Sequence, residues 1–441
     1  MSEKIKSIKE PVLKPGQLRF NNLNKWLRWQ ESLHFTAIEL GLERCRRVAD
    51  NMGLLKPGYT VISVAGTNGK GSSVIMLDQI LCSAGYKTGR YVSPHLLRYN
   101  ERICISGEEV TDTELCESFD RIDRARGDIS LTYFEFGTLA ALDLFRQHKV
   151  DLAILEVGLG GRLDAVNVLD ADVALISSID LDHQQWLGNN RESIGREKAG
   201  IFRNMAPAIC SDPKPPQSLL DCANALGTPL FLAGRDYNFT IHRDLWSWQS
   251  STTEFNDLPR PMQYSDFQLQ NAAGVMMILE KIKHDYPVSE ENIKQGFNNF
   301  RLNGRMQIIP GEIQKILDVA HNRQSVRALV NNLSKIPCVG KTHILIGMLK
   351  DKDHQEVLRI LNKVADSWNI VSLNQEERGT EAGLLVSILN KLKVNENIQT
   401  FINVNEALDK LQKSAMPGDR IIITGSFLTV GAALRYLKQE C

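Results

Sequence analysis

The stretch "TVISVAGTNGKGSSVIML", residues 60–77, places three glycines and one lysine between two apolar runs. The first run has the length of a buried strand and the second has helical spacing, so the stretch predicts a strand, a glycine-rich turn and a helix that begins at Lys70. Backbone N–H groups at the start of such a helix converge on an anion. The stretch therefore predicts a phosphate-binding loop in an α/β domain.

The residue types in the loop fit this chemistry. Gly66, Gly69 and Gly71 let the backbone approach phosphates, Lys70 can reach the β- and γ-phosphates, and the Ser72 hydroxyl can bind phosphate or its magnesium ion. The spacing is shorter than GxxxxGK[ST] before the lysine and has one extra glycine after it. Loop chemistry alone leaves open an ordinary glycine turn between a strand and a helix.

Strand-length apolar runs alternate with helical segments from residue 60 to about residue 235, as in βαβ units. A polar interval over 236–263 reads as a small hairpin and loop, and a helix follows over 266–283. The other predicted strands of this region are 88–93, 151–158, 172–179 and 206–210, and the other predicted helices are 71–85 and 132–149.

The strand pattern restarts after residues 300–311, with strands predicted at 315–321, 343–349, 369–374, 399–404 and 419–427. We expect a doubly wound, mostly parallel P-loop sheet domain over 1–300. A smaller Rossmann-like α/β domain over 301–441 follows, joined to it near 296–305.

Composition limits the partners. Lys plus Arg and Asp plus Glu number 52 each, so no basic surplus points to nucleic acid. The N-terminus has no apolar h-region and no run approaches roughly 18 apolar residues, so we expect no membrane segment and a cytoplasmic location. The eight cysteines form no CxxC pair, and we expect them to be reduced.

The loop "GTNGKGS" resembles the P-loop of the Mur ligase superfamily, and ordered matches along nearly the whole chain resemble the folylpolyglutamate synthase family. The matches include "LHFTAIELGLER" (33–44), "GRYVSPHLLRYNERI" (89–103), "ILEVGLGGRLDAVN" (154–167), "DLDHQQWLG" (180–188) and "IGMLKDKD" (346–353). The resemblance implies an ATP-dependent ligase that joins L-glutamate to dihydropteroate and to folates through an acyl phosphate.

Glu156 ends a buried strand and His183 follows the next one, at the edge where open α/β sheets bind ligands. A carboxylate among apolar residues is costly unless it meets a cation, whereas a lone histidine is usually a satisfied polar residue. The resemblance implies that Ser93, Glu156 and His183 hold Mg²⁺, with two ions expected, and it also allows a K⁺ ion.

Lys198, in "RESIGREKAGIF", reads alone as one cation on a solvated helix face. The resemblance implies instead that this lysine is carbamylated and helps to hold the second metal. Burial that lowers the lysine pKa would favour the neutral amine that reacts with CO₂.

Four residues outside the loop are unremarkable separately. The resemblance implies that Asn271 contacts adenine, that Arg305 reaches the phosphates from the second domain, and that Asp318 and His321 lie beside the ribose and adenine. Domain closure would then be part of catalysis. The expected catalytic residues are Lys70, His183, Lys198 and Arg305, and the expected loop contacts to ATP are Gly66, Thr67, Asn68, Gly69, Lys70, Gly71 and Ser72.

Aromatic residues cluster in "GDISLTYFEFGT", 127–138, where core packing and ligand stacking are equally good explanations. The resemblance implies a pterin pocket there. We also read 32–44 as a helix preceded by a loop, near the pterin. The implied pocket residues are Ser32, Leu33, His34, Thr132, Tyr133, Phe134, Glu135, Leu163, Asp164 and Ala165.

Three alternatives remain. A Mur-type ligase would need a further N-terminal UDP-binding domain, and about 58 residues precede the P-loop strand. A P-loop switch NTPase would hydrolyse ATP without an acceptor. A monofunctional folylpolyglutamate synthase would not use dihydropteroate. For the favoured reading we expect dihydropteroate, folates, L-glutamate and ATP as small-molecule substrates, and a monomer.

Overall fold

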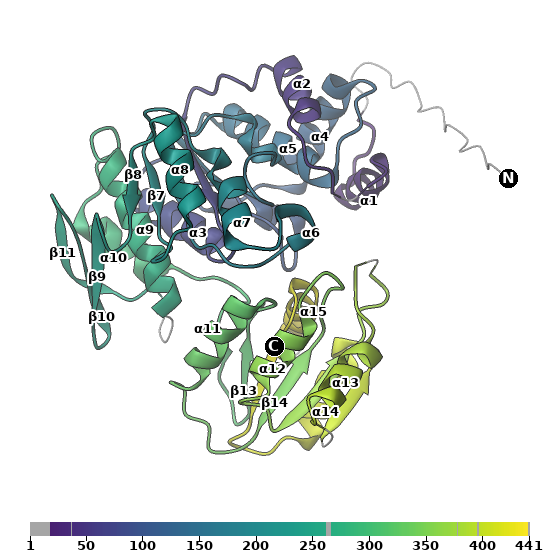
Figure 1. Ribbon diagram of the computed structural model, residues 1–441. Helices are drawn as coiled ribbons and strands as arrows, with labels where there is room; N and C mark the ends of the chain where they lie inside the picture. The colour runs from purple at the N-terminus through teal and green to yellow at the C-terminus, as the bar shows by residue number, and fades with distance from the viewer. Residues whose placement is uncertain (1–17, 37, 262–265, 377, 395–396, 440–441) are drawn as a thin grey trace.

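The computed structural model describes residues 18–36, 38–261, 266–376, 378–394 and 397–439. Figure 1 shows two α/β domains, with the C-terminal one packed below the N-terminal one. The α/β prediction is confirmed for both halves of the chain.

The N-terminal domain is built on an eight-stranded sheet of order β4-β3-β2-β5-β1-β6-β7-β8, in which all pairings are parallel except β2–β3 and β3–β4 at one edge. Side chains of β1 alternate between two cores, with Val61 and Ala65 in one and Ile62 and Val64 in the other. The strands are β1 (Thr60–Ala65), β2 (Thr88–Tyr91), β3 (Ile103–Ile105), β4 (Glu108–Glu109), β5 (Leu152–Glu156), β6 (Val173–Ile176), β7 (Ala208–Cys210) and β8 (Leu230–Leu232).

Helices cover both faces of this sheet (Figure 1). One face carries α1 (Leu23–Leu33), α2 (Glu43–Asn51), α4 (Asp112–Arg126), α5 (Tyr133–His148), α6 (Gln184–Leu187), α7 (Arg191–Lys198) and α8 (Gln217–Leu226). The other carries α3 (Lys70–Ser83), α9 (Asp266–Ile282) and α10 (Glu290–Asn299). Short 3₁₀ turns lie at Tyr99–Arg102, Ala165–Val168 and Ala199–Ile201.

One local prediction is incomplete and another is wrong. The interval over 236–261 is a three-stranded antiparallel sheet of β9 (Tyr237–His242), β10 (Leu245–Ser250) and β11 (Glu254–Pro259), because Trp246 and Trp248 bury its inner face against α9 and α10. Its last two expected residues, 262–263, lie outside the described ranges.

The helix expected over 32–44 is not formed: residues 32–33 end α1, residues 43–44 begin α2, and the residues between them connect the two helices, with residue 37 outside the described ranges. Gly41 has φ 155°, and its N–H donates to the Leu163 carbonyl at 3.2 Å. The apolar Ile38 and Leu40 line a cavity. Their apolar character therefore does not come from packing of a helix face on the core, which is what the prediction assumed.

The C-terminal domain has a six-stranded sheet of order β12-β13-β17-β14-β15-β16, with only β12 antiparallel. Its strands are β12 (Gln307–Ile309), β13 (Gln314–Leu317), β14 (Thr342–Ile346), β15 (Ser367–Val371), β16 (Ile398–Phe401) and β17 (Arg420–Thr424). Its helices are α11 (Arg323–Leu333), α12 (His354–Leu361), α13 (Ala382–Lys391), α14 (Val404–Ser414) and α15 (Phe427–Gln439).

Sequence analysis did not anticipate β12. The boundary expected after residue 300 falls between α10 and β12.

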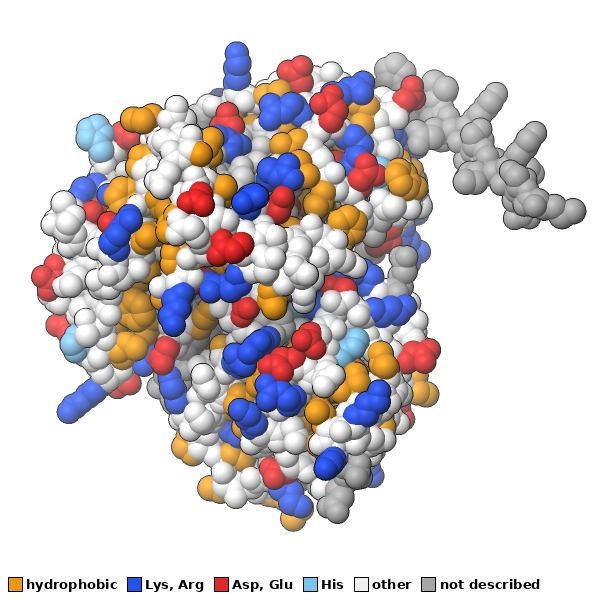
Figure 2. Space-filling view, in the orientation of Figure 1, with side chains coloured by type: hydrophobic (Ala, Val, Ile, Leu, Met, Phe, Trp, Pro, Cys, Tyr) orange, Lys and Arg blue, Asp and Glu red, His pale blue; other side chains and the backbone are white. Residues whose placement is uncertain are grey.

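The described residues show the state of the cysteines, the apolar length of the helices and the distribution of surface charge. Seven cysteines are free, and Cys441 lies outside the described ranges. No helix in the described part of the chain is long and apolar enough to cross a membrane. Figure 2 shows acidic and basic side chains intermixed over the visible face, in keeping with their equal numbers.

Candidate active site

The glycine-rich loop joins β1 to α3, and α3 begins at Lys70 as predicted. Gly66 has φ 149°, and a Cβ there would lie 1.9 Å from the Ser177 hydroxyl oxygen. Gly69 has φ 91°, and its Cβ would lie 2.3 Å from Asn271 Oδ1. Both positions therefore require glycine, for backbone conformation and for space.

Neighbouring residues hold the loop in shape. Thr67 donates its backbone N–H to the Ser178 carbonyl at 2.7 Å and its hydroxyl to the Asp180 carbonyl at 3.0 Å. Lys70 folds back over the loop, and its ammonium donates to the Gly66 carbonyl at 3.0 Å. Burial lowers the pKa of Lys70, and the nearby Glu156 carboxylate opposes that shift. The loop is thus preorganised beside a partly buried cation.

Glu156, the last residue of β5, lies beside this loop. Its Oε2 accepts the Ser93 backbone N–H at 3.0 Å, and a Cβ on Gly71 would lie 3.3 Å from the same oxygen. Burial raises the pKa of Glu156, and Lys70 opposes that shift most strongly. A buried carboxyl group at the mouth of a phosphate-binding loop fits a cation-binding role.

His183 and Lys198 line the same cavity. The buried Nδ1 of His183 has no hydrogen-bond partner among the described residues and lies 3.7 Å from Asp351 Oδ2. Burial lowers the pKa of His183 to about 4, so its ring is neutral near pH 7. Lys198 is 3% exposed, and burial, followed by the charge of Lys70, lowers its pKa to about 7. Lys198 is therefore buried, not part of a solvated helix face.

The described residues contain no group of three or more His, Cys, Asp or Glu side chains that could hold a metal ion. Glu156 and His183 supply one donor each, so further ligands would have to come from Ser93, a modified Lys198 or the substrate phosphates. This donor set fits an oxygen-rich Mg²⁺ site that is completed by ATP.

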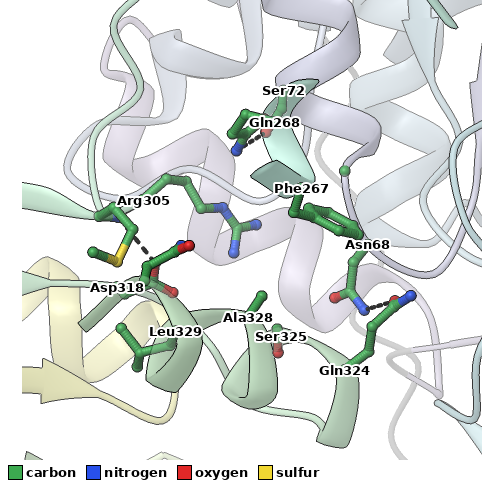
Figure 3. A pocket seen from close by; sticks show the side chains of 13 residues that line it. Asn68, Ser72, Phe267, Gln268, Arg305, Asp318, Gln324, Ser325, Ala328 and Leu329 are labelled. Atoms are coloured by element: carbon green, nitrogen blue, oxygen red, sulfur yellow. Dashed lines mark hydrogen bonds between the residues drawn. The ribbon is translucent and has the colours of Figure 1, made fainter. Parts of the chain in front are cut away.

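Residues of both domains meet in a smaller pocket behind the loop, shown in Figure 3. Ser72 and Gln268 line it from the N-terminal domain, and the Arg305 guanidinium points into it from the C-terminal domain. Asp318 also lines it, and its carboxylate accepts the backbone N–H groups of Met306 and Ala320 at 2.9 Å each.

Asn271 packs against the loop at Gly69 and is fully buried on α9, where its amide donates to Gln268 Oε1 at 3.1 Å. The expectation for an ordinary helical Asn, a place on the surface, does not hold here.

Polar contacts join the domains across the cleft, and sequence reasoning missed them. Asp182 accepts from Lys352 Nζ at 2.7 Å and from Asn322 Nδ2 at 3.0 Å, and Asn68 donates to Gln324 Oε1 at 2.6 Å (Figure 3). Asp182 and Asn322 are adjacent in sequence to the predicted site residues His183 and His321. This proximity was the sequence feature that could have indicated them.

The larger cavity has a volume of about 850 Å³ and runs from the glycine loop to the start of α5. Thr132 caps that helix, since its hydroxyl accepts the Glu135 N–H at 3.2 Å. The Glu135 carboxylate in turn accepts a hydrogen bond from the Arg44 guanidinium at 3.1 Å. Asp164 lines the same cavity, and burial raises its pKa to about 7. The predicted acceptor residues that line the cavity are His34, Thr132, Tyr133, Phe134, Glu135, Leu163, Asp164 and Ala165.

Ser32 and Leu33 do not line the cavity. Ser32 is exposed and donates to the Trp29 carbonyl at 2.9 Å, whereas Leu33 packs on the core. Both residues belong to the last turn of α1, whereas the connection that lines the cavity begins at His34.

Residues 64–214 match the Mur ligase middle domain, and residues 304–427 match the Mur ligase glutamate ligase domain. The Escherichia coli dihydrofolate synthase/folylpolyglutamate synthase is 42% identical over 94% of this chain and 95% of its own length. The Haemophilus influenzae protein of the same name is 38% identical over 92% of this chain and 96% of its own length.

The chain belongs to the dihydrofolate synthase/folylpolyglutamate synthase family.

Two solved structures of such enzymes have the same fold over most of their length. Escherichia coli FolC in complex with DHPP and ADP gives a TM-score of 0.89 at 42% identity, covering 95% of this chain and 98% of that chain. A bifunctional folylpolyglutamate synthase/dihydrofolate synthase with Mn, AMPPNP and L-glutamate bound gives 0.87 at 44% identity, with the same coverage. This family membership agrees with the family resemblance of the sequence motifs.

The structure gathers the family's expected site residues around one cleft. Most line the larger cavity, while Ser72 and Asp318 line the smaller pocket and Asn271 packs beneath the loop. The residues outside this arrangement are Ser32 and Leu33. The individual roles of the gathered residues remain predictions.

Proposed function

We propose that this chain uses ATP to join L-glutamate to dihydropteroate, giving dihydrofolate, and to folates, giving polyglutamates. The observation that carries the proposal is one cavity with two ends: the glycine loop with Lys70 lies at one, and the buried wall at the start of α5 lies at the other. Similar proteins bind DHPP with ADP, and Mn with AMPPNP and L-glutamate.

The chemistry requires activation, because a carboxylate attacked by an amine would have to release oxide. Transfer of the γ-phosphoryl group to the substrate carboxylate gives an acyl phosphate, whose leaving group is phosphate. The amino group of glutamate attacks this carbonyl and forms a tetrahedral intermediate, which collapses to the amide. ADP and phosphate are the other products. Positioning and charge stabilisation supply the rate, so no side-chain nucleophile is needed.

Lys70 would stabilise the charge on the transferred phosphoryl group from the loop side. Arg305 would do so from the C-terminal domain, where it lines both the larger cavity and the smaller pocket. Because the two cations come from different domains, they act together only while the cleft is closed.

Ser93, Glu156 and His183 would hold Mg²⁺, which neutralises phosphate charge when it is bound. The buried carboxyl group of Glu156 supports this assignment, as does the His183 Nδ1, which has no hydrogen-bond partner within the described ranges. Lys198 would react with CO₂ as the neutral amine, forming a carbamate and releasing a proton, and the new carboxylate would complete the site for a second ion. The K⁺ ion stays a prediction that turnover in K⁺ against Na⁺ buffers would test.

One chain supplies both domains of the cleft, so we propose that the monomer is the working unit and that it works in the cytoplasm. The Lys70→Ala variant should fold, because the hydrogen bonds of the Lys70 side chain to described residues go to loop carbonyls, but the variant should lose ATP-dependent ligation.

The deciding experiment measures phosphate release with dihydropteroate or tetrahydrofolate as acceptor, with and without glutamate. We expect release only when acceptor and glutamate are both present, and with either acceptor. Release without them would indicate a switch NTPase. No turnover of dihydropteroate would leave a monofunctional folylpolyglutamate synthase. Turnover only of a nucleotide-linked cell-wall precursor would indicate a Mur-type ligase.

A further inference from the structure

The buried face of α1 ends in a polar residue. Leu23, Trp26 and Gln30 are its buried positions, spaced three and four residues apart as for a helix that packs on a core. The first two join the apolar core, but Gln30 is 1% exposed and carries a carboxamide at a position where the pattern calls for an apolar side chain. The fold itself does not require this amide.

The carboxamide of Gln30 has no hydrogen-bond partner in the described part of the chain. Both Nε2 and Oε1 are buried without a hydrogen bond among the described residues. A carboxamide buried in this way destabilises the ligand-free fold, because it has left water without replacing the bonds that it made there. Such an orphaned pair points to a partner that is present only when something binds.

Gln30 lines the larger cavity at the end away from the glycine loop, together with His34 and Glu135. The polar atoms of these two neighbours are already used. His34 bonds to Ser130 at 3.0 Å and to Glu39 at 2.8 Å, and Glu135 accepts from Arg44 and from the Thr132 backbone. Of these three side chains, only Gln30 keeps both a donor and an acceptor without a partner among the described residues.

We infer that the Gln30 amide binds the pterin ring of the acceptor by two hydrogen bonds, an inference that rests on the proposed function. The lactam edge of a pterin presents an N–H donor next to a carbonyl acceptor. A carboxamide presents an acceptor next to a donor, and the two sets pair side by side, as Gln or Asn pairs with an adenine edge. Gln30 is a substrate-binding residue that distinguishes a pterin from a purely apolar ring.

The test compares Gln30→Met with Arg28→Met, an exposed change on the same helix that serves as the matched control. For each full-length protein, the dissociation constants of dihydropteroate and of ADP are measured, along with the melting temperature without ligand. For Gln30→Met we expect dihydropteroate to bind about tenfold to a hundredfold more weakly, because two hydrogen bonds are lost. We expect unchanged ADP binding and an equal or higher melting temperature, and Arg28→Met should match the wild type in all three.

Unchanged dihydropteroate affinity in Gln30→Met would overturn the inference and leave the amide with only a water molecule as its partner. A lower melting temperature with equally weakened ADP binding, or failure to fold, would also overturn it, since both mean that the amide supports the fold. Gln30→Leu should repeat the result with a branched side chain. If the wild-type protein does not bind dihydropteroate, the proposed function fails, and this inference fails with it.

Discussion

Replacing Gly69 with Ala should cripple nucleotide binding while the two domains stay folded. Gly69 has φ 91°, in the left-handed region, and directly precedes the first residue of α3. The added Cβ would lie 2.3 Å from Asn271 Oδ1 and 2.8 Å from its Cγ. Asn271 is fully buried and its amide donates to Gln268, so moving it away from the added Cβ breaks this buried hydrogen bond.

The magnitude follows from two costs. A non-glycine residue in the left-handed region costs about 1–2 kcal/mol. Displacing Asn271 breaks a buried hydrogen bond and leaves its partner unsatisfied, which costs about 1–3 kcal/mol. Together these give about 2–5 kcal/mol against the native loop conformation, or a loss of ADP affinity of about 30-fold or more.

Isothermal titration with ADP measures this loss, and urea unfolding shows whether the domains remain folded. Gly58→Ala is the matched control, because Gly58 has no heavy atom within 4 Å of an added Cβ and no positive φ. If Gly69→Ala binds ADP as tightly as Gly58→Ala, phosphate binding does not depend on the left-handed conformation of the loop at Gly69.

Three further predictions concern the cleft and its surroundings. Asp182→Asn should lower kcat/KM by about 30-fold or more, because Asp351, 3.5 Å away, is then the one charge partner left among the described residues for the buried ammonium of Lys352. Unchanged steady-state kinetics would contradict this. Lys198→Met should lose turnover, and the wild type should lose it in CO₂-free buffer and regain it with bicarbonate; full activity without CO₂ would refute carbamylation. Burial, and next the charge of Arg102, lowers the pKa of His95 to about 4. Between about pH 6.5 and pH 4 the folded state therefore binds fewer protons than the unfolded state, and the free energy of unfolding falls as the pH drops through this range. His95→Gln should remove up to about 3 kcal/mol of that fall in urea unfolding, and an unaltered pH dependence would exclude His95 as its source.

The parts of the fold that local pattern determines can be predicted from the sequence. Apolar runs flanked by turns predict β1, β5 and β6, and the carboxyl ends of β5 and β6 place Glu156 and His183 near the glycine loop. The connection after Leu33 was mistaken for a helix because its apolar residues line a cavity. Their spacing in the sequence cannot be told from that of a helix face that packs on a core.

The missed site residues depend on contacts through space. Asp182 and Lys352 are 170 residues apart, and nothing in either segment indicates that the two side chains meet. Gln30 occupies a core position of α1, and only its lack of partners among the described residues of the folded chain marks it. The family resemblance supplied the roles of Asn271 and Lys198, since the residues alone favoured exposed positions for both.

The central claim is that the loop at Lys70 holds ATP whose γ-phosphoryl group activates a carboxylate for attack by glutamate. The most direct measurement counts ADP, phosphate and amide in one reaction mixture with dihydropteroate and L-glutamate. One ADP and one phosphate should form for every dihydrofolate made, and neither should form when either substrate is left out. Dihydrofolate made without ATP consumption, or ATP consumed without dihydrofolate, would contradict the account.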